Sequence, residues 1–355
     1  QLQDTTIIPA TPAVPKQPHL WAKCLNYKKD IFVGVNGIVS PCPWFNNNYQ
    51  QNNFQLHWIK KINNRLTLNL TSHYTKGEGY YEQFRYGDFL SNYNIQPLIN
   101  KQGDTITQSN ITRRLWLNND FVGGIFNLNF IANSKLNFIL GGGYNTYYGK
   151  HYNQVRRADY MPGVNLNYQY MFYSTNKNDG NIYLKTNYSP FKDLNLFLDL
   201  QNRVVDYRYY GLYDTVNKKQ QTQSYGFFNP KIGMSFGNSD ILNFYASLSV
   251  AHKEPGGDDL TKNKVNQRPK AEELFDWEYG MKSKAKKINY NINIYQMIYK
   301  NQLVLNGQID NVGNPRHINV ANSYRRGIEF ELNSSPVKYF SFAGNITLSE
   351  NKILN

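Results

Sequence analysis

The stretch KINYNINIYQMIYK, residues 287–300, alternates apolar and polar side chains one by one over its first half. Between Ile288 and Ile294, one series of alternate residues consists of three isoleucines and Tyr290. The three residues between them are all asparagines. Side chains in a β-strand point to opposite faces in turn, so this period of two places the apolar residues on one face and the amides on the other. The stretch is therefore predicted to be a strand with one apolar and one polar face.

The same alternation recurs along the chain. It is present at 65–75, 193–207, 241–251 and 338–350, and no stretch shows a convincing 3.6-residue amphipathic pattern. The pattern predicts an all-β chain. Its twelve expected strands lie near 53–59, 65–75, 118–131, 135–148, 180–188, 193–207, 225–236, 241–251, 272–284, 287–300, 321–333 and 338–350.

Connections between these strands alternate strictly in length. Such alternation places every short turn at one end of the sheet and every long loop at the other, which is typical of a bacterial outer-membrane barrel. Several strands also exceed the roughly 5–6 residues of soluble sheets and match the roughly 9–11 tilted residues that cross a bilayer. The predicted fold is a transmembrane antiparallel β-barrel, and strand length argues against a soluble β-sandwich. The short turns are expected at 60–64, 132–134, 189–192, 237–240, 284–286 and 334–337, and the long loops at 76–117, 149–179, 208–224, 252–271 and 301–320.

The composition agrees with a wall that is apolar on one side only. The 355 residues include 29 Tyr and 20 Phe, yet the mean hydropathy is −0.63. No window of predominantly apolar residues is long enough to span a bilayer as a helix. Aromatic residues gather where strands meet long loops, as at Tyr74, Tyr144 and Tyr207, which is expected of a girdle at the headgroup level.

The charge is strongly basic, with 39 Lys+Arg against 25 Asp+Glu and a net charge of +14. Nucleic-acid binding would concentrate the basic residues on one face, but here they are spread over turns and loops, so no nucleic-acid partner is expected. Arg113, Arg114, Arg156 and Arg157 are expected in outer loops, where they could contact anionic lipopolysaccharide or attract an anionic ligand. Ordinary solvated loop charge is the alternative interpretation.

No catalytic pattern stands out. The six histidines have no metal-ligand spacing, and the chain has no nucleophile elbow or phosphate-cradling loop. His252, Glu254, Asp258 and Asp259 could gather around a cation, with a solvated polar loop as the simpler interpretation. The sequence therefore predicts no enzyme, no cofactor and no metal centre.

Several segments resemble TonB-dependent receptors, the plugged barrels that import scarce nutrients across the Gram-negative outer membrane. The resemblance begins near Tyr49, and its motifs are specific in their order and spacing. They are FFNPKIGMSF (227–236), ASLSVAHKEPGGDDL (246–260), PKAEELFDWEYGMK (269–282), YKNQLVLNGQIDNVG (299–313) and SYRRGIEFEL (323–332).

The resemblance implies a plug inside a barrel of 22 strands, with a TonB-engaging segment before the plug. The chain shows neither, so we expect about half of one receptor. Residues 1–48 are expected to be an irregular segment with a possible early strand, and residues 49–355 a partial barrel without the plug and the final strands. Within the first segment, Cys24 and Cys42 either pair in an oxidising compartment or remain thiols.

The resemblance also gives structural roles to motif residues. Gly327 is expected to let its strand bend as it enters the wall, and Pro230 to lie near the start of a strand, where a missing N–H donor is tolerated. Glu254 and Pro255 are expected to end a strand at the outer rim. In the motif around Gly327, the residues expected to face polar surroundings are Arg325, Arg326, Glu329 and Glu331, and those expected to face lipid are Ile328, Phe330 and Leu332.

By the same resemblance, the chain is expected in the cell outer membrane, in contact with lipid and lipopolysaccharide and coupled to TonB. Its expected function is active transport of a scarce nutrient. A ferric siderophore is the first candidate, with cobalamin, another metal chelate or an oligosaccharide behind it. The expected ligand contacts are aromatic or cationic residues near the outer mouth, namely Tyr147, Tyr148, Tyr152, Arg156, Arg157, Tyr209 and Tyr210.

Three alternative functions remain open at this point. A passive diffusion porin would need a closed wall without a plug. An outer-membrane hydrolase would need a Ser/His pair at the lipid interface, and His73 is the inward strand histidine to test. An adhesin would keep the outer loops but show no energy-dependent uptake.

Overall fold

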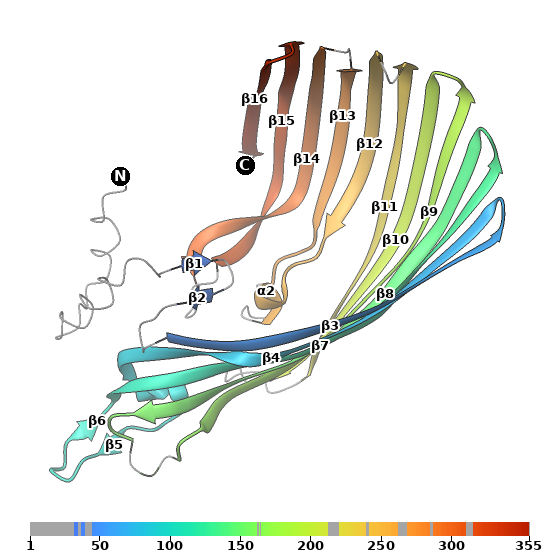
Figure 1. Cartoon of the computed structure of the whole chain (residues 1–355). Helices are drawn as coiled ribbons and strands as arrows, with labels where there is room; N and C mark the ends of the chain where they lie inside the picture. Colours follow the sequence, from blue (N-terminus) through green and yellow to red (C-terminus); the bar gives the residue numbers. More distant parts are fainter. Residues whose placement is uncertain are drawn as a thin grey trace.

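The computed structural model describes residues 32–34, 37–39, 45–161, 163, 165–211, 220–238, 241–261, 268–284, 287–309 and 315–354. Its main feature is one 12-stranded antiparallel sheet in which consecutive strands are neighbours. The sheet curves into an open wall with β3 and β16 at its edges (Figure 1). Its strands are β3 (Phe45–Asn63), β4 (Leu66–Phe89), β7 (Gln108–Asn133), β8 (Leu136–Ala158), β9 (Tyr168–Phe191), β10 (Leu194–Gly211), β11 (Gln221–Asn238), β12 (Leu242–Lys253), β13 (Glu272–Lys284), β14 (Ile288–Ile309), β15 (Pro315–Val337) and β16 (Phe340–Leu354).

Smaller elements lie at the loop end of the wall. Two short hairpins are formed by β1 (Phe32–Gly34) with β2 (Gly37–Val39) and by β5 (Leu98–Ile99) with β6 (Thr105–Ile106). The described helices are η1 (Leu90–Tyr93), a single 3-10 turn, and α2 (Gly257–Thr261). Neither has the length and apolar character needed to cross a membrane.

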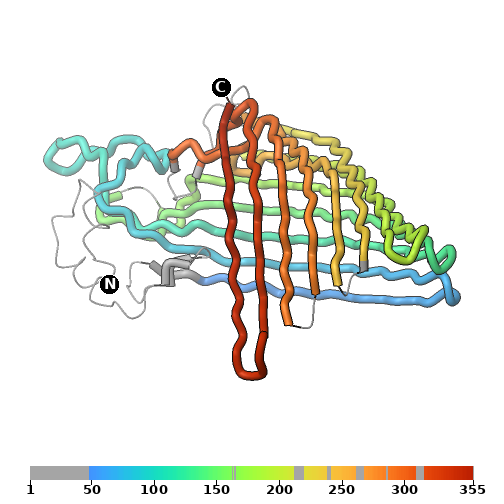
Figure 2. Tube along the Cα trace, turned by 90° about the horizontal axis from the view of Figure 1, so that it is seen from above, coloured from blue at the N-terminus to red at the C-terminus, as the bar shows by residue number. Residues whose placement is uncertain are grey.

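The twelve predicted strands and their antiparallel arrangement are confirmed, and the predicted strand 272–284 coincides with β13, but several other outer ends were placed wrongly. The predicted loop 76–117 is largely strand, because β4 continues to Phe89 and β7 begins at Gln108. The same holds for the predicted loops 149–179 and 301–320, since β8, β9, β14 and β15 all extend into them. Figure 2 shows these long strands running side by side. The first strand of the wall likewise begins at Phe45, earlier than expected.

The two faces of the wall follow from α2, which lies on the concave side (Figure 1). Leu260 of α2 packs in one buried cluster with Val205, Tyr207 and Tyr209 of β10, so the odd-numbered residues of β10 face inward. Residues directly opposite in an antiparallel pair share a face, and the registers therefore assign both faces of the neighbouring strands.

The outward face carries exposed apolar side chains, as a lipid-facing wall requires. On β4, Leu66, Leu68, Leu70 and Tyr74 point outward, and Lys76 is the first charged residue above them. This span equals the roughly 9–11 residues that cross the hydrocarbon layer. β4 has 24 residues and β7 has 26, so much of each strand rises beyond the layer. Other exposed outward residues of this apolar belt are Phe126, Leu140, Ile182, Leu184, Leu198, Ile232, Phe244, Leu248, Ile328 and Phe330.

Glycines on the inward face lie beneath aromatic rings of an adjacent strand. Directly opposite residues form four such pairs: Gly141 with Tyr183, Gly233 with Phe197, Gly280 with Tyr245, and Gly327 with Tyr295. In each pair the ring occupies the space that a Cβ on the glycine would need. Such a ring compensates for the packing that a glycine cannot provide within a strand.

The substitution Gly280→Ala is expected to lower the free energy of unfolding by about 1–3 kcal/mol, the usual cost of overpacking. Its Cβ would collide with the backbone oxygen of Ile292 and with the Tyr245 hydroxyl. Gly226→Ala is the matched control, because a Cβ there meets no atom within 4 Å. Thermal unfolding in detergent compares them, and equal midpoints would contradict the tight contact.

Two buried clusters lie at the loop end of the wall. The first, which we call the outer cluster, joins η1 to the upper strands and consists of Leu90, Tyr93, Ile95, Ile111, Val155 and Tyr170. The second, the α2 cluster, consists of Val205, Tyr207, Tyr209, Phe227 and Leu260. These clusters give the loop end packing of its own, beyond the reach of the membrane.

Candidate functional site

The wall splits along part of its height between β11 and β12. Their ladder runs from Asn238 with Leu242 up to Lys231 with Ser249 and goes no further. Pro230, which has no N–H to donate, is the first residue of β11 above this point. It lies in the middle of β11, opposite Leu200 of β10, and not near a strand start as the motif suggested. The split allows the chain after β12 to leave the sheet.

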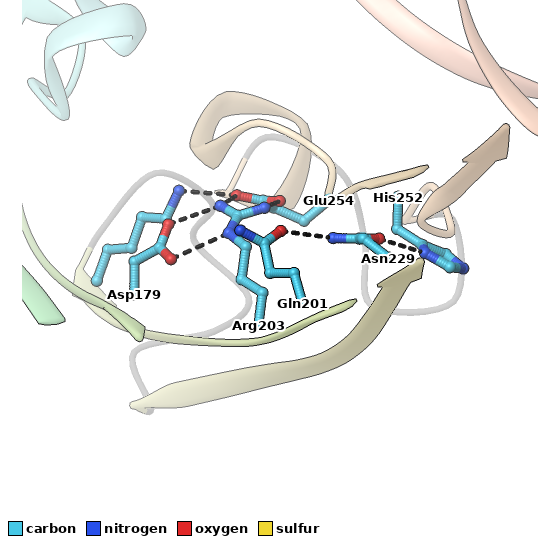
Figure 3. Close-up of polar contacts among 7 residues, drawn as sticks. Asp179, Gln201, Arg203, Asn229, His252 and Glu254 are labelled. Carbon is cyan, nitrogen blue, oxygen red and sulfur yellow. Dashed lines mark hydrogen bonds and ion pairs between the residues drawn. The ribbon is translucent and has the colours of Figure 1, made fainter. Parts of the chain in front are cut away.

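Glu254, the first residue after β12, reaches the inward faces of two other strands. Its carboxylate accepts hydrogen bonds from Lys177 Nζ of β9 at 2.8 Å and from Arg203 Nη1 of β10 at 2.8 Å. Arg203 also binds Asp179 of β9, with Nε to Oδ1 at 3.0 Å and Nη2 to Oδ2 at 2.6 Å (Figure 3). Two cations and two carboxylates thus form a neutral, half-buried cluster, which we call the charge quartet.

A chain of amide contacts runs from Gln201, the inward neighbour of Arg203 on β10, toward the split. Asn229 Nδ2 donates to Gln201 Oε1 at 3.1 Å, and His252 Nδ1 lies 2.9 Å from Asn229 Oδ1 (Figure 3). The His252 ring also stacks on Phe227 with centroids 5.2 Å apart. These contacts hold the end of β12 against β11 where the backbone ladder is missing.

The segment 254–261, which we call the strap, is held at its far end as well. Leu260 is buried in the α2 cluster, and its carbonyl accepts a hydrogen bond from Arg268 Nε at 2.9 Å. Asp259 Oδ1 lies 3.1 Å from His317 Nδ1 of β15. Pro255 is fully buried. The strap therefore lies across the inner face of the upper wall and links distant strands.

The acidity of Glu254, which lies outside the spanning strands, follows from these contacts. Burial raises the pKa of its carboxyl, but the hydrogen bonds from Arg203 and Lys177 outweigh burial and lower the pKa from 4.5 to about 2. A depressed pKa in the folded state stabilises that state above the unfolded pKa, and the contribution is lost as pH falls through the folded pKa.

The strap is therefore expected to stay closed from pH 7 to about 5 and to loosen between pH 4.5 and about 2. Hydrogen exchange of the strap amides, corrected for the intrinsic effect of pH, measures this. The outer cluster amides serve as the internal reference, and Glu254→Gln should abolish the dependence. Loosening of the wild-type strap already at pH 6 would contradict the assignment.

The structure separates the predicted ligand contacts. Tyr147 and Tyr209 lie on the inward face. Tyr147 donates to Asn119 Oδ1 at 2.7 Å, and Tyr209 is buried beneath α2. Their role as ligand contacts stays a prediction.

The other predicted contacts lie elsewhere. Tyr148, Tyr152 and Tyr210 face outward, and the Tyr152 ring stacks on Trp116 with centroids 5.6 Å apart. Arg156 and Arg157 are exposed near the end of β8, where Arg156 Nη1 donates to Asn167 Oδ1 at 3.2 Å. The seven residues are therefore divided between the two faces of the wall, and their role as ligand contacts stays a prediction.

The predicted motif residues divide between the faces. Arg325 points inward over the Tyr299 ring, 5.4 Å from its centroid, whereas Arg326 points outward and binds Glu350. Glu329 lies on the inward side with Gly327. The strand pairing continues in register on both sides of Gly327. Gly327 therefore provides room for the Tyr295 ring, whereas the motif had suggested a bend in the strand.

Two further expectations concern metal and disulfide chemistry. Within the described part of the chain, no group of three or more His, Cys, Asp or Glu residues is placed to hold a metal ion. Cys24 and Cys42 lie outside the described residues, as does most of the segment 1–48, so the disulfide and the domain division stay predictions.

Comparison with known proteins gives the same fold. The copper transporter OprC superimposes with a TM-score of 0.68 at 11% identity, over 87% of this chain and 48% of that one. The siderophore receptor PiuA from Acinetobacter baumannii gives 0.60 at 15% identity, over 87% and 48%. The ferric-catecholate import receptor Fiu from E. coli K12, in its closed form, gives 0.58 at 14% identity, again over 87% and 48%. The chain thus spans about half the length of these proteins.

No curated protein matches the chain in sequence. The family model described as "TonB dependent receptor-like, beta-barrel" matches residues 29–353. The family and the structural neighbours are transporters rather than enzymes. The chain belongs to the TonB-dependent receptor β-barrel family.

Proposed function

We propose that this chain forms part of the wall of a receptor that imports a scarce nutrient across the cell outer membrane, with energy supplied through TonB. The observation that carries the proposal is the family match over residues 29–353, on a wall with an apolar outer belt and a polar inner face. The outer belt would meet lipid, and the strand ends above it would meet lipopolysaccharide.

A ferric siderophore is the cargo we propose first. Among the structural neighbours, PiuA is described as a siderophore receptor, Fiu as a ferric-catecholate import receptor and FecA as a ferric citrate transporter. OprC, described as a copper transporter, makes another metal the second candidate.

Uptake of radiolabelled iron chelates by cells that express the intact protein tests the proposal. Cells with functional TonB are expected to accumulate at least one chelate, and cells without TonB are expected to lose that accumulation. Cells that lack the protein but retain TonB give the background. Uptake that persists unchanged without TonB would refute the proposal and favour passive diffusion.

A further inference from the structure

Lys177 and Arg203 present two cations side by side on the inner wall. They lie on the neighbouring strands β9 and β10, and both donate to the same carboxylate, that of Glu254. Their side chains are 26% and 23% exposed, whereas that of Glu254 is 9% exposed. The inner face of the wall therefore contains a dicationic position that already holds one carboxylate.

The two carboxylates of the quartet differ in how they are held. Asp179 belongs to β9, and its fork-to-fork pairing with Arg203 crosses two hydrogen-bonded strands of the wall. Glu254 belongs to the strap, which leaves the sheet at the split above Lys231. Movement of the strap would thus remove Glu254 and leave Asp179 in place.

Removal of Glu254 alone would leave the two cations undercompensated. Arg203 would keep Asp179, while Lys177 would keep the face of the Tyr207 ring, 4.9 Å from its Nζ. A partly buried cation without its carboxylate is costly, so an incoming carboxylate would be favoured at this position. The incoming carboxylate would accept charge-assisted hydrogen bonds from Lys177 and Arg203 in place of those that Glu254 had accepted.

We propose that Lys177 and Arg203 form a carboxylate-binding site, which Glu254 fills in this conformation and which a carboxylate of the transported ligand takes over when the strap lifts. The inference rests on the proposed function and adds the chemical class of the ligand. Because Leu260 is buried against Tyr207 and Tyr209, ligand binding at this site is coupled to uncovering of the α2 cluster.

The inference predicts competition between a tethered and a free carboxylate. A short tether gives an effective concentration in the millimolar range or above, so free carboxylates should bind the wild-type protein weakly. Loss of the tethered group should tighten the binding of a free dicarboxylate about tenfold or more.

Titration calorimetry of the intact protein in detergent with glutarate tests this. Both Glu254→Gln and Glu254→Ala are expected to lower the apparent Kd, and adding Lys177→Met is expected to reverse the gain. Glu254→Gln keeps an oxygen that accepts hydrogen bonds. It therefore shows the effect of removing the charge even where alanine disturbs the packing of the wall. Glu350→Gln, which removes an ion-paired carboxylate from the outer face, is expected to leave the Kd unchanged.

Several results would overturn the site. They are an equal Kd in the wild type and both Glu254 variants, a gain that survives Lys177→Met, equal binding of the neutral diamide of glutaric acid, or tighter binding of inorganic phosphate than of glutarate. The titration needs no TonB, so its outcome does not depend on the result of the uptake experiment. TonB-dependent uptake without the glutarate gain would remove only the inference, whereas the gain with TonB-independent uptake would remove the proposed transport mechanism.

Discussion

Replacing Arg203 with methionine is expected to lower the free energy of unfolding by about 2–3 kcal/mol, the cost of removing charge-assisted hydrogen bonds from two half-buried carboxylates. Arg203 pairs with Asp179 on one side and Glu254 on the other. Methionine keeps much of the side-chain volume, so the loss of stability measures the effect of removing the charge. The carboxylates of Asp179 and Glu254 would then be left with the cation of Lys177. Lys177 donates a hydrogen bond to Glu254 and not to Asp179.

The control for this variant is Arg208→Met on the same strand. Arg208 is exposed on the outward face of β10, so its replacement is expected to change stability by no more than about 0.5 kcal/mol. Chemical unfolding of both variants in detergent gives the comparison, and hydrogen exchange locates the change. Similar losses for the two arginines would show that the quartet contributes no special stability.

Replacing Tyr93 with alanine is expected to cost about 3–5 kcal/mol within the outer cluster. Tyr93 is fully buried, its hydroxyl donates to Asp88 Oδ2 at 2.7 Å, and its ring meets Tyr170 edge-on with centroids 4.8 Å apart. The change therefore removes both a large packed ring and the partner of a carboxylate.

The effect of Tyr93→Ala should be local. Amides of η1 and of the ends of β4 and β9 are expected to exchange faster, while the lower halves of the same strands keep their protection. Tyr86→Ala is the control, because Tyr86 is 49% exposed. Protection that falls evenly over the whole wall would contradict an independently packed outer cluster.

The sequence predicts the lower half of the wall well because lipid imposes a simple rule there. Most outward positions between a short turn and the headgroup level are apolar, as Leu66, Leu68 and Leu70 illustrate. The resulting period of two gives the strand number, the order and the short turns.

The upper half lacks this signal. Above Lys76 both faces of β4 carry polar side chains, yet its pairing with β7 continues to Phe89. Backbone hydrogen bonds hold the strands together there without any alternation in the side chains, so the sequence suggests a loop. The same reason explains the late predicted starts of β7 and β9.

The site was predictable only in part. The motif around Glu254 correctly places it just after a strand, but its partners Lys177, Asp179 and Arg203 come from distant strands and belong to no contiguous motif. A usable signal exists, since all three occupy the inward series of β9 and β10. Their approach to Glu254 depends on the split at Pro230, which sequence alternation cannot show.

The aromatic rings over inward glycines have a consequence for the bore of the barrel. Tyr183, Phe197, Tyr245 and Tyr295 lie along the wall where a side chain would otherwise fill the space. Because each ring lies over a glycine, it projects less far from the wall than a ring that pointed away from the sheet would. The inner surface of the wall therefore stays close to the backbone at these positions. At each of these four positions, the depth of the inner wall is therefore set by one ring lying over a glycine rather than by two opposed side chains.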